Sequence, residues 1–407
     1  MPRGTDAFAS TQAAWRFWRN PHVALPQLAQ PLIDTGKEAV TECCDEFVLV
    51  VHDWSNLHYK SHSSKRDVTS LSCAFAKGYV LQSALLVSDR SGHPLAPVFQ
   101  ALQSADGVYS SRAWEVQPPC SQLDSLEPVM DFVEYQQFSR PAVHIVDAEA
   151  DSIAHYRQWS ESPSRLFLVR ADAARLVEHA GEERSVAGVQ QELHVQRAFR
   201  QARKVEYHGK PAEQWLAETS VMLRRPARPQ RKGEPRRTIA GPPVTLRLIV
   251  SEVRDAAGNL LATWYLLTNV PQGVAGERIA LWYYWRWRIE SYFKLLKTAG
   301  QQIEHWQQDN ALAIAKRLLV ASMACVIVWR IARSPEPEVQ KLAKFLVRLS
   351  GRQTKRTRPI TDSALLAGMW TFLTMLEALR SYNADEIEKF ARLARHYARP
   401  GPASEGA

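Results

Sequence analysis

The chain of 407 residues has few cysteines and lacks the apolar segments of a membrane or secreted protein. Its five cysteines are an odd number without a C-x2-C pair, and no histidine lies at zinc-ligand spacing, which argues against a disulfide framework and a structural zinc. The longest apolar run, residues 318–329, is shorter than the roughly 17–25 residues that a spanning helix needs. No secretory signal is visible at the start. We therefore expect a cytoplasmic protein with reduced cysteines and no membrane partner.

Acidic residues are also outnumbered. The chain has 51 lysines and arginines against 42 aspartates and glutamates, a formal charge of +9. A basic balance favours an acidic partner, of which nucleic acid is the commonest large one. With 45% hydrophobic and 23% charged residues, the composition predicts a sizeable core and excludes general disorder. The length suggests about two to four domains.

Strands and helices alternate in the first part of the chain. Residues 46–51 predict a buried strand that ends at His52 and Asp53, and residues 142–146 predict another that ends at Asp147. A meander is completed by strands at 79–87 and 95–103, and the other expected elements are helices at 124–138 and 150–159 and a strand at 165–170. This order predicts an α/β fold with a mixed sheet.

Residues 173–245 interrupt this pattern, with few regular apolar runs. They include a basic, proline-rich segment, residues 224–237, which is either a solvated loop or a contact with flanking duplex DNA. A hairpin is predicted from residues 244–253 and 260–267. From about Arg278 onward the chain reads as all-helical, with helices expected at 279–297, 311–333, 337–349, 364–379 and 384–397.

The helix predicted at 279–297 carries a polar stripe. Five side chains recur every three or four residues and fall within an arc of about 80° on one helix: Tyr283, Arg286, Glu290, Lys294 and Lys297. An apolar face lies beside them, formed by Trp285, Ile289, Tyr292, Phe293 and Leu296. A solvated amphipathic helix is the simplest explanation. A stripe of cationic and phenolic groups with one carboxylate also suits a polyanion that holds a metal ion.

The spacing Tyr283-x2-Arg286-x3-Glu290-x6-Lys297 resembles the Y-x2-R-x3-E-x6-K signature of the insertion-sequence-four family of DDE cut-and-paste transposases. The surrounding sequence is similar to that family as well, in Trp287-Arg288-Ile289-Glu290, in residues 264–268 and in residues 16–21. The resemblance covers roughly residues 12–397. It implies an RNase H-like catalytic core in which two aspartates on neighbouring strands and a helical glutamate bind two divalent ions.

The resemblance places these ligands at Asp53, Asp147 and Glu290. Residues 147–151, Asp-Ala-Glu-Ala-Asp, look like the family's D-R-E-A-D, with Ala148 in place of the arginine. The strand-end positions point to the same two aspartates independently. Glu149 and Asp151 are alternative ligands if the alignment is shifted, and His52 is expected to serve packing. The implied cofactor is Mg2+, with Mn2+ as a substitute, for in-line displacement at phosphorus.

The resemblance also implies how DNA is held. Tyr283, Arg286 and Lys297, with Lys294 beside them, would bind phosphates near the transposon end. The family seals the broken end as a hairpin and flips out one base. Trp264 would stack on that base, with Trp287 as its neighbour. Without the resemblance, Trp264 reads as a core aromatic.

The expected organisation is an N-terminal remnant of a helical DNA-binding domain (1–40), an RNase H-like core in two parts (41–172 and 269–335) around a β-rich insertion (173–268), and a helical dimerisation region (336–407). The predicted function is cut-and-paste transposition by a homodimer on double-stranded DNA, in a bacterial cytoplasm and associated with the nucleoid. Two alternatives stay open. One is an N-terminally truncated, non-catalytic inhibitor that dimerises with a full-length transposase, and the other is an RNase H-like nuclease without strand transfer.

Overall fold

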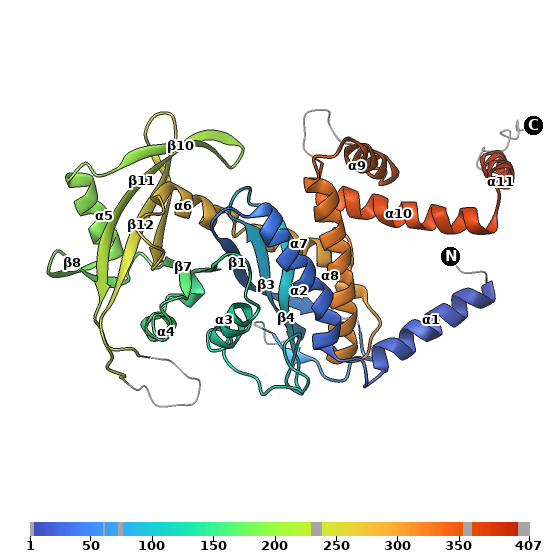
Figure 1. The fold of residues 1–407 in the computed structure, drawn as a ribbon, viewed down its shortest axis with the longest axis horizontal. Helices are drawn as coiled ribbons and strands as arrows, with labels where there is room; N and C mark the ends of the chain where they lie inside the picture. The colour runs from blue at the N-terminus through green and yellow to red at the C-terminus, as the bar shows by residue number, and fades with distance from the viewer. Residues whose placement is uncertain (1–3, 60–61, 72–75, 229–237, 353–359, 398–407) are drawn as a thin grey trace, which may run out of the picture. The chain divides into compact units, whose positions relative to one another are not determined.

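The computed structural model describes residues 4–59, 62–71, 76–228, 238–352 and 360–397, and in these residues it is a mixed α/β protein (Figure 1). This confirms the predicted fold class at that level. The chain divides into two compact units. The larger one is Ala24–Val326, and the smaller one combines Met1–Val23 with Ile327–Ala407.

The larger unit is built on one sheet, to which 13 strands of the described residues belong. Their order is β5-β4-β3-β1-β6-β7-β13-β12-β11-β8-β9, with β2 beside β3 and β10 beside β11. The first seven strands are β1 (Val48–His58), β2 (Thr69–Ser70), β3 (Lys77–Ser88), β4 (Pro94–Gln103), β5 (Val108–Ser110), β6 (Ala142–Val146) and β7 (Leu166–Ala171). The remaining six are β8 (Leu176–His179), β9 (Glu182–Ser185), β10 (Arg200–Tyr207), β11 (Lys210–Leu223), β12 (Val244–Arg254) and β13 (Leu260–Thr268).

Strand β1 lies at the centre of the first half of the sheet. It pairs antiparallel with β3 on one side and parallel with β6 on the other, and β7 continues parallel to β6. The prediction that the first strand ends at Asp53 is wrong, because β1 continues to His58. Every residue of β1 pairs with a residue of the long strand β3. This pairing extends β1 beyond the apolar run 46–51, from which the strand end was predicted.

The segment predicted as a β-rich insertion (173–268) continues the same sheet. Strand β13 pairs antiparallel with β7, and β12, β11, β8 and β9 follow outward. The hairpin of β12 and β13 is confirmed. Strands β8 to β11 and helix α5 (Val186–Val195) precede the hairpin, so the segment is rich in strands, although it has few regular apolar runs. Strands β10 and β11 carry polar residues among their apolar ones, so they contain no long apolar run.

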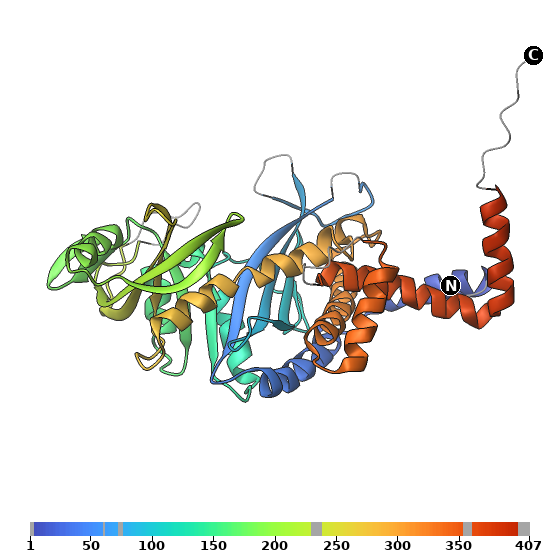
Figure 2. The same cartoon turned by 90° about the horizontal axis from the view of Figure 1, so that it is seen from above.

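Helices cover both faces of the first half of the sheet. Helices α2 (Leu25–Cys43) and α3 (Leu126–Tyr135) pack against β1, β3 and β4 on one face. On the other face, Gln100 of β4 donates to the hydroxyl of Tyr292 in α7 (Arg288–Lys297) and to Ser322 in α8 (Ala311–Arg333). Figure 2 shows α6 (Gly276–Trp285) and α7 following one another along the sheet. The short helix α4 (Ile153–Trp159) packs with α3 and α5 in a second core cluster.

The described chain after β13 is helical, as predicted. Helices α9 (Pro337–Leu349), α10 (Asp362–Ser381) and α11 (Ala384–Tyr397) belong to the smaller unit, as does α1 (Gly4–Arg19). Helix α8 has 23 residues, so by length and composition it could cross a membrane, contrary to the estimate from its apolar run. However, 67% of its most apolar window is buried inside the protein, as in the core helix of a soluble protein.

Candidate active site

Asp53 and Asp147 lie side by side on neighbouring parallel strands. The register pairs Val51 of β1 with Ile145 of β6, and each aspartate follows two residues later. Because side chains alternate along a strand, both carboxylates project from the same face of the sheet. The strand-end prediction is confirmed for Asp147, which directly follows β6 and accepts a hydrogen bond from the N–H of Ala148 at 2.7 Å.

The helix predicted at 279–297 is two helices. Helix α6 ends at Trp285 and α7 begins at Arg288, with a tight turn between them. In that turn the N–H of Arg286 donates to the carbonyl of Tyr283 at 3.0 Å, a three-residue step in place of the four-residue step of an α-helix. The stripe is therefore not one solvated helical face. Tyr283 and Arg286 are buried, whereas Glu290 and Lys294 are exposed.

Arg286 joins the three predicted acids. Its Nη1 lies 3.0 Å from Oδ2 of Asp53, and its Nη2 lies 3.1 Å from Oδ2 of Asp147 and 4.0 Å from Oε1 of Glu290. The guanidinium side chain is only 7% exposed, while the acids are 20%, 34% and 44% exposed in the same order. We call Asp53, Asp147 and Glu290 the acidic triad. Three segments far apart in the sequence thus share one cation.

The environment of Asp53 disfavours its negative charge. Burial raises the pKa of this carboxyl to about 6, although Arg286 and the N–H of Trp54 act in the opposite direction. The charges of Glu290 and Asp147 raise this pKa further. A single guanidinium therefore does not compensate the acidic triad fully.

Asp147 is better supported. Burial pushes its pKa upward, but Arg286, the Ala148 N–H and the Tyr283 hydroxyl outweigh burial and hold the pKa below its ordinary value. Tyr283 donates its hydroxyl to Oδ1 of Asp147 at 2.9 Å, and burial raises the pKa of this phenol. Arg170, at the end of β7, lies 3.8 Å from the same oxygen. The sequence analysis did not select Arg170. Its position near the end of β7, the parallel strand next to β6, could have indicated that it lies close to Asp147.

The lysines of the stripe have different surroundings. Lys297 donates to the backbone carbonyl of Asn56 in β1 at 2.5 Å, and burial lowers its pKa. This contact fastens the end of α7 to β1 beyond Asp53. Lys294 is exposed one turn earlier on α7. The stripe thus contributes one lysine to holding the helix and presents one to solvent.

The acidic triad has the donor chemistry of a Mg2+ site, because carboxylate oxygens are the ligands this ion takes. The three carboxylates already converge on one cation, the Arg286 guanidinium. As they are placed, the described residues contain no group of three His, Cys, Asp or Glu side chains that could hold a metal ion, and the Arg286 guanidinium contacts all three carboxylates of the triad. The donor set fits the ion, provided that Arg286 moves.

The alternative ligands lie elsewhere. Asp151 pairs with Arg175 at 2.9 Å and is only 4% exposed, so it serves the local structure. Glu149 is exposed. His52 is buried on the opposite face of β1 and shares a 2.9 Å hydrogen bond with His144 of β6, in agreement with a packing role. Burial lowers the pKa of His52 to about 3, so its ring is neutral.

Trp264 and Trp287 line one cavity of about 60 Å³ between α6 and strands β10 to β13. We call this cavity the aromatic pocket. Its other aromatic residues are Tyr207, Tyr283 and Tyr284, and its polar side holds a hydrogen-bonded chain. In that chain Arg203 donates to Gln214 at 2.7 Å, and Gln214 donates to Ser251 at 2.7 Å. Sequence reasoning missed the chain because its members come from three strands of the predicted insertion. Trp264 is partly buried and Trp287 is 62% exposed.

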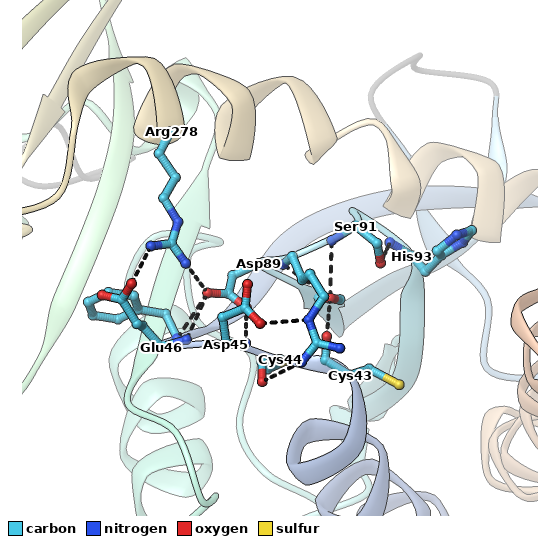
Figure 3. A network of polar contacts seen from close by, with 11 residues as sticks. Cys43, Cys44, Asp45, Glu46, Asp89, Ser91, His93 and Arg278 are labelled. Atoms are coloured by element: carbon cyan, nitrogen blue, oxygen red, sulfur yellow. Dashed lines mark hydrogen bonds and ion pairs between the residues drawn. The ribbon is translucent and has the colours of Figure 1, made fainter.

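A separate polar cluster fastens α6 to the sheet (Figure 3). Asp89, at the end of β3, accepts three backbone hydrogen bonds, from the N–H groups of residues 45, 46 and 47, at 2.8 to 3.1 Å. Arg278 of α6 binds Asp89 at 2.7 Å and Glu46 at 2.6 Å. We call Glu46, Asp89 and Arg278 the anchor cluster. In the following turn Gly92 has φ +67°, and a Cβ there would lie 2.4 Å from the Trp285 ring, so the turn packs tightly on α6.

The predicted basic segment is described only in part. Arg224 pairs with Glu178 at 2.9 Å and Arg225 with Glu183 at 2.6 Å, so these two side chains already have acidic partners. Arg228 is exposed. Residues 229–237 lie outside the described residues, and a DNA contact by this segment stays a prediction.

Comparison with known proteins adds no assignment. No family model matches this sequence, and no curated protein matches it.

Proposed function

We propose that this protein is a DDE transposase that cuts and joins double-stranded DNA by phosphoryl transfer. The observation that carries the proposal is the convergence of the acidic triad, from β1, the end of β6 and α7, around one buried guanidinium. From sequence, the Tyr-Arg-Glu-Lys spacing pointed to Glu290, and the family resemblance and the strand-end positions pointed to Asp53 and Asp147. A random set of three acids separated by so many residues would not be expected to share one cation.

The strand order supports the proposal. The run β4-β3-β1-β6-β7, with β6 and β7 parallel to β1, is typical of an RNase H-like sheet. In that fold, acids on the central strand and on its parallel neighbour face a helix across one side of the sheet. Asp53, Asp147 and Glu290 occupy such positions.

In the proposed reaction the acidic triad would hold two divalent ions, Mg2+ or Mn2+. When bound, such ions activate a water or a 3′-hydroxyl and stabilise the oxygen that leaves phosphorus. The chain's own contribution is to aim its three carboxylates at one point. Tyr283 and the Ala148 N–H orient Asp147, and the Trp54 N–H orients Asp53 at 2.8 Å.

The positive and aromatic groups around the triad suit DNA. Arg286 and Lys294 would bind backbone phosphates. Lys297 and Tyr283, which the resemblance also assigns to DNA, would have to exchange their present acceptors, the Asn56 carbonyl and Asp147, for a phosphate. The net charge of +9 favours the same partner. A protein of this kind would work on the nucleoid.

The aromatic pocket would receive a base that is flipped out when the DNA end closes as a hairpin. An indole face can replace part of the stacking energy that an extruded base loses. Trp264→Ala should lower the yield of hairpin about tenfold while leaving the first nick less affected, as resolved on a denaturing gel. Equal loss of both products would return Trp264 to a purely structural role.

The smaller unit suits the pairing of two protomers. Helix α10 carries apolar side chains that are each 41–51% exposed in this chain: Trp370, Leu373, Met375, Leu376 and Leu379. Phe390 and Leu393 of α11 are similarly exposed. Homodimerisation on DNA is part of the proposal, because two transposon ends must be held together before excision.

The presence of all three acids favours a catalytic protein over the truncated inhibitor, because an inhibitor that only binds DNA and its partner does not need metal-binding carboxylates. The two proposals differ in one measurable respect. An inhibitor would bind DNA and a full-length partner without cutting, whereas the catalytic protein cuts alone. A nuclease without strand transfer would cut but leave no joined product.

The test is cleavage of DNA carrying the sequences that flank the gene, by the full chain with Mg2+. We expect nicks and hairpins, and we expect Glu290→Ala to lower the rate at least about a hundredfold while sparing DNA binding in a gel-shift assay. Glu149→Gln, which alters an exposed acid outside the triad, is the matched control and should cut normally. If Glu290→Ala cuts as well as the wild type, the catalytic assignment is wrong.

A further inference from the structure

Arg286 occupies the oxygens that a divalent ion would need. Its two terminal nitrogens contact Oδ2 of Asp53 and Oδ2 of Asp147 at 3.0 and 3.1 Å. The remaining oxygens also have donors. Oδ1 of Asp53 accepts from the Trp54 N–H, and Oδ1 of Asp147 accepts from Tyr283 and from the Ala148 N–H. A divalent ion that binds both aspartates must therefore displace the guanidinium, because it needs the same oxygens and carries the same sign of charge.

The place of Arg286 in the chain is suited to such a displacement. The residue lies in the turn between α6 and α7, where the regular helical hydrogen bonds are interrupted. Its guanidinium carbon lies 5.6 Å from the ring centroid of Trp287, the neighbouring residue, which is exposed. The exposed indole ring of Trp287 therefore offers the guanidinium a cation–π contact outside the acidic triad.

A DNA phosphate is the natural acceptor for the displaced side chain. A guanidinium binds a phosphate with two parallel hydrogen bonds, as it now binds the two carboxylates. One phosphate would take the place of two aspartates as partner of Arg286, and a divalent ion would take the place of Arg286 as partner of the aspartates.

We propose that Arg286 is a resident counter-cation that keeps divalent ions out of the acidic triad until a DNA phosphate draws it away. The inference rests on the proposed function, since it concerns the same triad. Metal and DNA then bind cooperatively through one side chain. By linkage, DNA raises the affinity for metal by the same factor by which metal raises the affinity for DNA.

The test is Mn2+ binding to the full-length protein, followed through the electron paramagnetic resonance signal of free Mn2+, with and without a saturating 20-base-pair duplex. The wild type should bind Mn2+ roughly tenfold more tightly with the duplex than without it. Arg286→Gln should bind Mn2+ roughly tenfold more tightly than the wild type in the absence of DNA. The duplex should then change the affinity of this variant by less than about twofold.

Arg278→Gln is the matched control, because it removes a guanidinium of the same helix pair that bridges two other acids. It should behave as the wild type. Arg286→Lys keeps the charge but cannot bridge both aspartates, so its Mn2+ affinity without DNA should lie between those of the wild type and Arg286→Gln. Circular dichroism establishes whether each variant is folded. If Arg286→Gln does not fold, Arg286→Lys takes its place in the Mn2+ measurement.

Two results would overturn the inference. One is an Arg286→Gln protein that binds Mn2+ no more tightly than the wild type without DNA. The other is a wild type whose Mn2+ affinity does not respond to the duplex. Both leave the proposed function standing if Mn2+ still binds and Glu290→Gln weakens it. If no variant binds Mn2+ with or without DNA, the proposed metal-dependent function fails together with the inference.

Discussion

The anchor cluster and the acidic triad both join carboxylates to an arginine of the α6–α7 region, but they are buried in opposite ways. In the anchor cluster the acid that accepts the backbone N–H groups is inside, since Asp89 is 0% exposed, while Arg278 is 28% and the second acid, Glu46, is 63% exposed. In the triad the arginine is inside, and each of the three acids is more exposed than Arg286. Asp89 also accepts three backbone N–H groups, whereas among the described residues Asp53 and Asp147 each accept one backbone N–H, that of the next residue, and Asp147 also accepts the Tyr283 hydroxyl.

This difference in burial distinguishes a structural ion pair, the anchor cluster, from a candidate cation-binding site, the acidic triad. A buried acid that is surrounded by fixed donors has no capacity for a further ligand, and its role is to hold α6 against the sheet. Acids that are partly open to solvent and share one guanidinium have oxygens that another cation can claim. Charge alone would not distinguish the two clusters, because each combines several acids with an arginine.

The largest expected effect on stability is at the anchor cluster. Asp89→Ala removes the acceptor of three backbone N–H groups and of Arg278, so the free energy of unfolding should fall by about 3–5 kcal/mol. Urea unfolding followed by circular dichroism measures it. Asp45→Ala is the control, because both side chains of its pair with Arg90 are about half exposed, so solvent screens the pair and its loss should affect stability far less than the loss of Asp89. A loss below 1 kcal/mol for Asp89→Ala would remove the contrast.

The triad should respond in the opposite direction. Because the pKa of Asp53 is raised to about 6 from an ordinary value of 3.8, its charge costs stability above pH 6, and the cost fades as the pH falls toward 4. Asp53→Asn should therefore stabilise the metal-free protein at pH 8 by on the order of 1–2 kcal/mol and change little at pH 4. Urea midpoints at both pH values, with a chelator present, measure this. A variant less stable than the wild type at pH 8 would contradict the account.

The smallest effect is expected at Arg170. This side chain is 43% exposed and lies 3.8 Å from Asp147, so solvent screens the pair. Arg170→Gln should change the free energy of unfolding by less than about 0.5 kcal/mol in the same urea experiment. A larger loss would mean that a second arginine shares the work of Arg286, and that the triad is more closely balanced in charge than its geometry indicates.

Much of the fold could be predicted from the sequence, and the errors have a common cause. The short apolar strand before Asp147 and the helices after Arg278 have local patterns that survive in the structure. The end of β1 depends on its pairing with β3, which a local pattern does not contain. Asp53 was singled out for a strand end that is not there, because β1 continues to His58.

The candidate site shows the same limit. The YREK spacing brought Tyr283, Arg286 and Glu290 to attention, and a straight helix accounted for their common face. The turn after Trp285 contains neither glycine nor proline, so the local sequence did not predict a break in the helix. Its consequence, a guanidinium buried between the aspartates, depends on the sheet register of β1 and β6. That register could not be known before the strands were paired.

The most direct test of the central claim is a crystal structure of the full chain with a short duplex and Mn2+, with the anomalous signal of manganese recorded. The account predicts manganese peaks bounded by the carboxylates of Asp53, Asp147 and Glu290, with the guanidinium of Arg286 moved onto a DNA phosphate. A duplex bound without manganese at these carboxylates, and with Arg286 still bridging the two aspartates, would contradict it.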